Sequence, residues 1–434
     1  MQIIQLKQHS SIIIQISKYL FILMPFLLIS GPLLSDLSVS LISIFFLYFC
    51  IKHKKLNLFN KLYFKVFFIF WIYLLLNSLL NNFNLDSFKI SFFYLRFGIF
   101  CLAIVYIIKS DEKILKYFLV CLTLCFIILI IDGYLQYFTG SNLIGFQKTG
   151  NRISSFFGDE LVLGSYLSRF FPIFFGLAIL FKERIKLNFN FLILFFVLIE
   201  TLVFLSGERT AFFYINLSAI YTIILIKDYK KTRIITLCLT AILLILISYI
   251  NPVAKDRIID KTISQMNLSP TTEKTHNDKQ INNSKNVYIF SEQHNSHYIT
   301  AYRMFKDNLL FGVGVKNFRN FCSNIKYNFS EKSCSTHPHN TYIQLLSETG
   351  LIGFGFIFIF LIIFIKYTLK HFILMFRKKY YFTDFQICMM SCILIIIWPA
   401  APTGNFFNNW LSILYYLPIS LIIWSFEKNK KIYF

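Results

Sequence analysis

The chain has 434 residues, of which 56% are hydrophobic and only 15% are charged. Its mean hydropathy of +0.61 excludes an ordinary soluble globular protein, because such proteins carry more charge and less apolar surface. The formal net charge of +22 does not indicate a nucleic-acid-binding protein, because the basic residues separate apolar runs instead of gathering on one soluble surface. The composition predicts an integral membrane protein.

The apolar runs are long enough to cross a bilayer as helices, since a hydrocarbon core of about 30 Å needs about 20 helical residues. The first run lacks a small-residue cleavage pattern, so we interpret it as a membrane span and not as a cleaved signal peptide. The sequence predicts an all-α fold, a polytopic membrane helix bundle of about twelve transmembrane helices. The predicted spans lie near residues 12–30, 37–51, 66–80, 90–108, 117–138, 161–181, 191–206, 211–226, 234–250, 351–367, 386–400 and 411–425.

The positions of lysine and arginine predict how these helices are oriented. Positive residues in short loops resist translocation and mark the cytoplasmic side. If the N-terminus is inside, the segments on the cytoplasmic side hold more than half of the 43 basic residues. An even number of spans then puts both termini in the cytoplasm. The short loops on the outer side hold only Lys89, Lys148, Arg152 and Arg209.

Three regions follow from this topology. Residues 1–250 form transmembrane helices one to nine, residues 251–350 form one large extracytoplasmic loop, and residues 351–434 form the last three helices and a cytoplasmic tail. Within the loop, residues 264–298 are polar with few apolar side chains. Such a composition is typical of a flexible stretch that cannot bury enough surface to order itself.

The second part of the loop carries two folding signals. Residues 299–320 have the pattern of an amphipathic helix, which we expect to end at a turn at Gly312 or Gly314. Their G-x-G spacing alone is too weak to predict a nucleotide-binding loop. Cys322 and Cys334 can form a disulfide if the loop faces an oxidising compartment, and the sequence leaves this open.

Three arginines lie close to outward membrane ends, namely Arg152, Arg209 and Arg303. Their position opposes the topology signal and therefore requires another reason. A guanidinium group binds phosphate or carboxylate through two parallel hydrogen bonds, so one interpretation is a site for an anionic group. The other is that each side chain only reaches lipid phosphate at the membrane surface.

A histidine-rich segment, Thr336-His337-Pro338-His339-Asn340, precedes the tenth predicted span. Histidine titrates near neutrality and can take a proton from a hydroxyl group, so His339 is a candidate general base. His337 and His339 could also bind a metal ion, but the chain has no outward D-x-D or D-x-E pair to complete a divalent-cation site. Alternatively, His339 only holds a turn together with Asn340.

Two carboxylates, Asp159 and Glu160, stand at the outward start of the sixth predicted span. They can cap that helix, pair with a neighbouring arginine or contact a bound molecule, and we expect a cap or a pair. Charged residues within the spans are costly in hydrocarbon and are expected to face the bundle interior as pairs. These residues are Arg96, Asp132, Arg169 and Glu200.

The chain from about residue 150 to residue 366 resembles a known family. Residues 338–353 resemble the signature of the O-antigen ligase and O-antigen polymerase superfamily of bacterial envelope enzymes. Glu208 and the polar stretch 264–298 depart from the family pattern. Three further segments agree in order and spacing: residues 301–314 with the family's loop helix and G-x-G turn, residues 206–211 with its outward arginine, and residues 152–164 with its earlier arginine segment.

The resemblance implies a glycosyltransferase of the cytoplasmic (inner) membrane that needs neither metal nor cofactor and has its active site on the periplasmic side. Such an enzyme takes a glycan from a polyprenyl diphosphate carrier, such as undecaprenyl diphosphate, and moves it to a hydroxyl of a glycolipid or glycan acceptor. The resemblance implies that Arg209 and Arg303 bind the diphosphate, that Arg152 assists and that His339 acts on the acceptor. Candidates for acceptor contact or structural support are Asn340, His337, Asp159 and Glu160.

Two alternatives to a ligase remain at this stage. A polymerase of the same superfamily would join carrier-linked repeats, and the sequence favours a ligase only through its His-Asn segment and the glycine-rich start of the following span. A non-enzymatic flippase of lipid-linked sugars would also have about twelve spans. However, the sequence contains no internal repeat, and its polar candidate residues gather on one side.

Overall fold

A computed structural model describes residues 12–81, 83–150, 152–182, 189–250, 255–265, 288 and 290–429. Most of the polar stretch 264–298 lies outside the described residues. Within them the structure is helical, with isolated β-bridges and no β-strand. The all-α, polytopic character predicted from the sequence is therefore confirmed.

Eight stretches among the described residues are long and apolar enough to cross a membrane, namely α3, α4, α5 with α6, α7, α8, α12, α17 and α19, and α1, α10, α11 and α18 are shorter apolar helices. Each predicted span coincides with at least part of one of these helices, and the number of crossings remains a prediction. The helices are α1 (Ile12–Ile22), α2 (Met24–Ile29), α3 (Pro32–Lys52), α4 (Leu62–Leu80), α5 (Leu85–Phe93), α6 (Leu95–Ser110), α7 (Lys113–Thr139), α8 (Leu163–Leu180), α10 (Phe189–Leu205), α11 (Arg209–Leu225), α12 (Lys230–Ile250), α14 (Lys261–Gln265), α15 (Glu292–Asp307), α16 (Phe318–Phe321), α17 (Thr341–Phe376), α18 (Asp384–Ile396) and α19 (Asn409–Lys428), with short turns η2 (Leu56–Asn60), η3 (Ser155–Phe157) and η4 (Asp256–Asp260).

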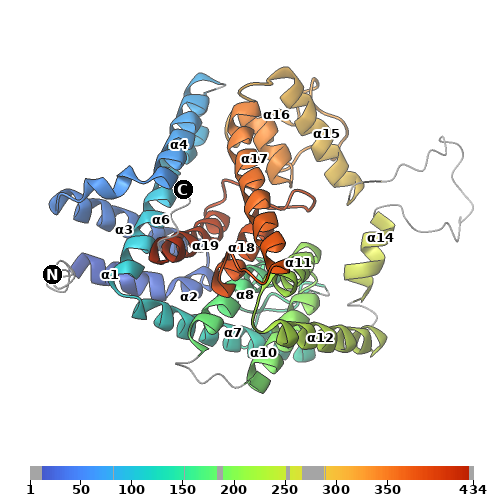
Figure 1. Cartoon of the computed structure of the whole chain (residues 1–434). Coiled ribbons are helices and arrows are strands. Elements are labelled where there is room, and N and C mark those ends of the chain that lie inside the picture. Colours follow the sequence, from blue (N-terminus) through green and yellow to red (C-terminus); the bar gives the residue numbers. More distant parts are fainter. Residues whose placement is uncertain are drawn as a thin grey trace, which may run out of the picture.

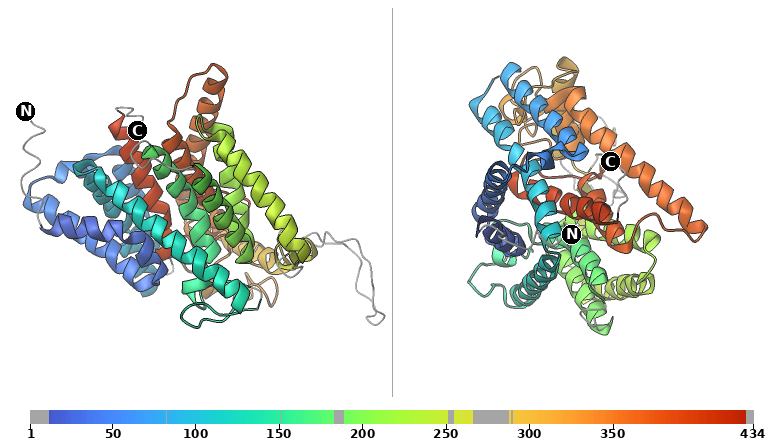
Figure 2. Two further views of the ribbon diagram at one scale, coloured as in Figure 1. Left: turned by 90° about the horizontal axis from the view of Figure 1, so that it is seen from below. Right: turned by 60° about the vertical axis from the view of Figure 1, so that its left-hand side comes forward.

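Helix α8 lies at the centre of the bundle, where α7, α10, α11 and α18 pack around it. It is buried on almost every side. Phenylalanine rings fill much of the space between these helices, as where Phe171 of α8 meets Phe196 of α10 with ring centroids 4.7 Å apart. Figure 2 shows this group of helices beside a second group formed by α1, α3, α6 and α19. The central position of α8 matters because its N-terminal end contacts Glu208, the residue before Arg209.

Helices α15 and α16 lie outside the spans at one end of the molecule, where they pack against α17 (Figure 1). Helix α15 starts at Glu292, earlier than predicted, because Ser291 caps it by accepting a hydrogen bond from His294 N. It ends at Asp307, five residues before Gly312, so the predicted helix is present but begins and ends earlier than expected. The turn expected at Gly312 and Gly314 is present, with φ of 67° and 101°.

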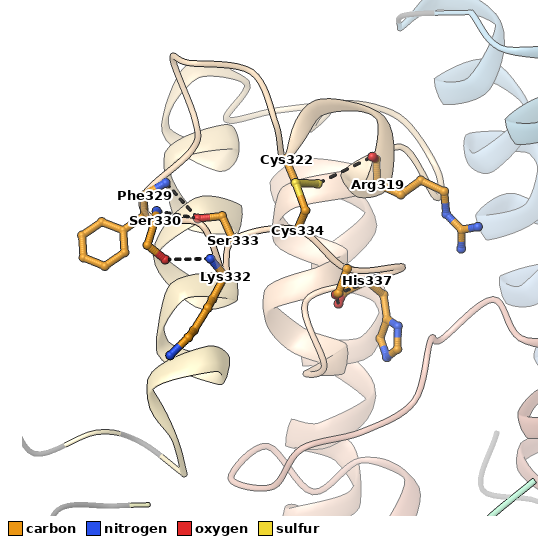
Figure 3. Close-up of a disulfide and its surroundings, with 9 residues drawn as sticks. Arg319, Cys322, Phe329, Ser330, Lys332, Ser333, Cys334 and His337 are labelled. Carbon is orange, nitrogen blue, oxygen red and sulfur yellow. Dashed lines mark hydrogen bonds between the residues drawn. A yellow bond between two sulfur atoms is a disulfide. The ribbon is translucent and has the colours of Figure 1, made fainter.

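A disulfide between Cys322 and Cys334 closes the segment that follows α16 (Figure 3), with their Cα atoms 5.1 Å apart. Buried Ala301, Met304 and Phe318 pack with Cys322 in a small apolar cluster separate from the membrane core. The disulfide therefore joins the α15–α16 unit to the chain that leads into the histidine-rich segment.

Helix α17 has a break at Gly350, whose φ is 61° and ψ is −166°. A Cβ atom on Gly350 would lie 2.3 Å from the carbonyl carbon of Leu310, and one on Gly312 would lie 2.5 Å from the carbonyl carbon of Glu348. Both glycines are required because two backbone segments meet there without room for a side chain.

The backbone groups freed by this break bond to the segment around Gly312 instead of to their own helix. Buried amide and carbonyl groups without partners would be costly, so this exchange stabilises the break. The exchanged bonds run from Val313 N to Ser347 O (2.8 Å), from Gly314 N to Glu348 O (3.0 Å) and from Leu351 N to Leu309 O (2.8 Å).

Charged residues within the spans are arranged in two ways. Arg96 pairs with Asp36 at 2.6 Å, and Arg233 pairs with Glu200 at 2.8 Å. Among the described residues no carboxylate forms an ion pair with Arg169, so the expectation that the four predicted intramembrane charges all form pairs is wrong. Asp132 accepts hydrogen bonds from Leu143 N, Asn142 Nδ2 and Ser155 Oγ instead of pairing with a cation.

Candidate functional site

The histidine-rich segment is held against the connection between α18 and α19. Asn340 caps α17 by accepting hydrogen bonds from the backbone N–H of Tyr342 (3.0 Å) and Ile343 (3.1 Å). Its amide also donates to the carbonyl oxygen of Pro399 at 2.8 Å. Asn340 therefore has a structural role that its place in the sequence already suggested, because asparagine is among the favoured residues at helix N-caps.

His339 lies between His337 and Asn340, which are both held by the connection between α18 and α19, and it has a left-handed backbone conformation with φ of 57°. Its carbonyl oxygen accepts a hydrogen bond from Thr403 N at 2.8 Å. On one side, His337 Nε2 lies 3.1 Å from the carbonyl oxygen of Thr403. A non-glycine residue in this conformation costs about 1 kcal/mol or more and persists only where its surroundings fix it. The fold thus fixes the direction in which His339 points.

Four imidazole rings meet at this point, and we call His294, His297, His337 and His339 the histidine cluster. The ring centroid of His339 lies 4.1 Å from that of His337, 5.3 Å from that of His297 and 5.6 Å from that of His294. His339 is the central member because it touches all three other rings. The first two members come from α15 and the other two from the segment before α17.

Burial lowers the pKa of every ring in the histidine cluster. Burial, together with the neighbouring charge of His339, lowers the pKa of His294 and of His297 to about 4 and that of His337 to about 3. Burial also lowers the pKa of His339. All four rings are therefore neutral at pH 7, and a neutral imidazole has a lone pair that can accept a proton.

Arg209, at the start of α11, lies within electrostatic range of the histidine cluster, since its positive charge is the smallest of the causes that lower the pKa of His294. Its guanidinium donates hydrogen bonds to Gln265 Oε1 at 2.8 Å and to Thr262 Oγ1 at 3.3 Å, both on α14. His294 therefore interacts with both Arg209 and His339, two of the residues singled out from the sequence.

Glu208 explains the start of α8. Its buried carboxylate accepts hydrogen bonds from the backbone N–H of Gly164 (2.6 Å) and Ser165 (3.0 Å). Burial raises the pKa of Glu208, while these hydrogen bonds and the charge of Arg152 lower it. Arg152 also donates to the carbonyl oxygen of Leu161 at 3.0 Å. The residue that departs from the family pattern thus caps the central helix and neighbours Arg152.

The cap predicted for Asp159 or Glu160 is wrong. Both side chains are exposed, and the residue at the N-cap of α8, Val162, makes no side-chain cap. Glu208 takes that position from another loop, which a local motif in the sequence cannot reveal. A contact of Asp159 or Glu160 with an acceptor remains a prediction.

The side chain of Arg303 points away from the histidine cluster, toward the segment closed by the disulfide. Its guanidinium donates to the carbonyl oxygen of Asn328 at 2.6 Å and lies 5.3 Å from the ring centroid of Phe329. It follows His297 by six residues on α15, which places the two side chains about 120° apart around the helix. No described contact joins Arg303 to the histidine cluster, so its role in binding a diphosphate stays a prediction.

Sequence reasoning missed three residues of this region. His294 and His297 were assigned to the flexible stretch, although the spacing of three residues places both on one helical face once Ser291 is seen as a cap. Arg319 was also missed, and its charge lowers the pKa of His337. Figure 3 shows the side chains of Arg319 and His337 extending toward the same side of the disulfide-closed segment.

The fold and this outward end define a polytopic helical membrane protein with neutral imidazoles and arginine side chains gathered at one end of the bundle. Residues 192–358 match the sequence model of a family described as O-antigen ligase. The match covers less than half of the chain, and over this region the chain is similar to the O-antigen ligase family. The matched region contains Arg209 and the histidine cluster, whereas Arg152 lies outside it. No curated protein matches the chain.

Proposed function

We propose that this protein is a membrane glycosyltransferase that moves a glycan from a polyprenyl diphosphate carrier to an acceptor hydroxyl outside the cytoplasmic membrane. The observation that carries the proposal is that His339 and Arg209, far apart in the sequence, both interact with His294. The ring centroid of His339 lies 5.6 Å from that of His294, and the charge of Arg209 contributes to lowering the pKa of His294. The superfamily match covers both residues.

In the proposed reaction, His339 accepts the proton of the acceptor hydroxyl as its oxygen attacks the anomeric carbon. The bond from that carbon to the diphosphate oxygen breaks, and the electron pair leaves with the diphosphate. Arg209 stabilises the charge that grows on this leaving group, and Arg152 assists from beside Glu208. One displacement of this kind inverts the configuration of the anomeric centre.

Two observations support an extracytoplasmic position for the site. The lysines and arginines predict that the loop faces outward. In addition, a disulfide closes the loop, and disulfides persist in oxidising compartments such as the periplasm. A donor presented at that surface would be the lipid-linked glycan after it has crossed the membrane.

A reaction with purified full-length protein tests the proposal. Polyprenyl diphosphate-linked glycan and an acceptor are incubated with the protein in the presence of a chelator, and the anomeric configuration of the product is read by NMR. We expect transfer with inversion. Retention of configuration, or no turnover with any lipid-linked donor, would contradict the mechanism.

Within this function we favour a ligase over a polymerase, on the resemblance of the segment around His339. Deletion of the gene separates the two, because loss of a ligase leaves long carrier-linked polymer and loss of a polymerase leaves single repeats on the acceptor. Carrier-linked glycan trapped on the cytoplasmic face in the deletion strain would instead indicate a flippase.

A further inference from the structure

Arg169 of α8 is an arginine inside the helix bundle with no ion pair to a carboxylate among the described residues. Its described contacts are a hydrogen bond from Nη1 to the carbonyl oxygen of Ser165 at 3.1 Å and a position 5.3 Å from the ring centroid of Tyr214. Arg96 and Arg233, the two comparable arginines, each have a carboxylate partner. An intramembrane cation without a counter-charge is costly and therefore indicates a function.

The surroundings of Arg169 hold further polar groups without partners. The Nε atom of Arg169, the hydroxyl of Tyr214 and the hydroxyl of Tyr298 are buried and form no hydrogen bond in the described structure. The Nε atoms of Arg96 and Arg233 also lack hydrogen bonds among the described residues, so the distinguishing features of this region are the two tyrosine hydroxyls and the missing counter-charge of Arg169. Buried hydroxyls are nearly always paired, and a bound phosphate group would give these a partner. Arg169 itself remains partly exposed, although the residues around it on α8 are buried.

These groups connect the bundle interior to the histidine cluster. Tyr298 follows His297 directly on α15, and it is close enough to Tyr214 for the two hydroxyls to interact electrostatically. Tyr214 follows Arg209 by five residues on α11, so it lies about 7 Å deeper along that helix. Arg169 is thus placed below Arg209, on the membrane side of the same outward end.

We propose that Arg169, with the hydroxyl of Tyr214, binds a phosphate group of the lipid-linked diphosphate on the membrane side of Arg209. This inference rests on the proposed function and adds a residue outside the matched family region. A diphosphate needs more than one cation, and Arg303 is directed toward Asn328 and Phe329 instead. Arg169 supplies the second positive charge where the lipid chain of the carrier would continue into the membrane.

Binding to full-length protein in phosphatidylcholine nanodiscs tests this assignment. The probes are undecaprenyl diphosphate, undecaprenyl monophosphate and phosphatidylglycerol, because a phospholipid headgroup offers the same phosphate chemistry. We expect Arg169→Gln to weaken binding of undecaprenyl diphosphate about tenfold or more, as for loss of one charge-assisted hydrogen-bond donor. The matched control is Arg96→Gln, which removes a paired intramembrane arginine and should leave binding unchanged.

The melting temperature of the ligand-free protein gives an independent readout. Arg169→Gln should leave it unchanged or raise it, because no internal ion pair is lost, whereas Arg96→Gln should lower it. If Arg169→Gln does not fold, Tyr214→Phe decides, since it keeps the ring and removes one hydroxyl. We expect it to weaken binding about threefold or more.

Unchanged binding of undecaprenyl diphosphate by the folded variants would overturn the assignment and leave the proposed transferase standing. The same holds if the variants lose only phosphatidylglycerol binding, since a structural headgroup would then occupy the site. If the wild-type protein binds no polyprenyl diphosphate, both the assignment and the proposed donor are wrong.

Discussion

Arg233 and Arg169 are both arginines in the interior of the helix bundle, yet their surroundings differ. The guanidinium of Arg233 is fully buried, pairs with Glu200 and lies against the rings of Phe171, Phe175 and Phe196. Around Arg169 no carboxylate is paired with the guanidinium in the described part of the chain, and nearby hydroxyls remain without partners. The positive charge of Arg233 thus has a counter-charge within the chain, and we propose that a ligand supplies the counter-charge for Arg169.

In the proposed function, this difference separates charges that stabilise the helix bundle from charges that bind a substrate. We call the Arg233–Glu200 pair between α10 and α12 the closed region, and the surroundings of Arg169 that lead to His339 the open region. Substitutions in the closed region should lower stability and leave activity unchanged. Substitutions in the open region should impair binding and turnover, with little effect on folding. The following predictions test this division.

The largest expected effect is on turnover at the open region. Replacing His339 by Ala removes the proposed base, and we expect the transfer rate to fall by roughly 10²- to 10⁴-fold. The rate is measured with purified protein at saturating donor and acceptor. The melting temperature and carrier binding should change little, and a variant with full activity would refute the general-base role.

The largest effect on stability is expected at the closed region. Replacing Arg233 by Gln leaves the Glu200 carboxylate buried without its partner, and we expect a loss of about 3–5 kcal/mol of unfolding free energy. Denaturation in detergent measures this loss. Activity per folded molecule should stay at the wild-type level. A double variant, Arg233→Met with Glu200→Gln, should recover most of the stability, because no charge then remains buried.

A smaller loss of stability is expected outside the membrane. Replacing both Cys322 and Cys334 by Ser opens a loop with a sequence separation of 12 residues, and we expect a loss of about 2–3 kcal/mol in the stability of the α15–α16 unit. Limited proteolysis with and without reductant measures it. Wild-type protein treated with reductant should behave as the double variant does, and equal resistance of all forms would show that the disulfide contributes nothing.

The smallest effect is a dependence of stability on pH. The pKa values of the buried histidines are lowered in the folded state, so the unfolded chain binds more protons between about pH 6.5 and about pH 4. Stability should therefore fall as pH falls through this window and stay level above it. Each histidine contributes at most about 1.4 kcal/mol per pH unit. Melting curves at pH 7.5 and pH 5 should show the fall, and His297→Gln should reduce it.

The sequence predicted the membrane helices well because apolar runs, and the basic residues that separate them, are local signals. The division between α10 and α11, for example, follows directly from the polar or small residues Ser206, Gly207 and Glu208 that separate the two apolar runs. The family resemblance, carried by the segment around His339, is supported by the match over residues 192–358.

The arrangement of the site depends on contacts between distant segments, which the sequence could not specify. Glu208 caps a helix that begins more than forty residues earlier, as seen from its bond to Gly164. His294 and His297 join His339 only because α15 packs against α17. The orientation of Arg303 likewise depends on Asn328, a residue in the disulfide-closed segment with no motif of its own.

The break in α17 has a consequence for how the protein can be divided. Because the backbone around Gly350 forms its hydrogen bonds with the stretch beside Gly312, neither the segment before α17 nor α17 itself has all its backbone hydrogen bonds without the other. An excised loop would lose the hydrogen-bond partners that α17 supplies, and a hybrid protein that exchanges only the loop would pair unmatched segments. Exchanges between relatives should therefore include both hydrogen-bonded segments, from α15 through the first half of α17.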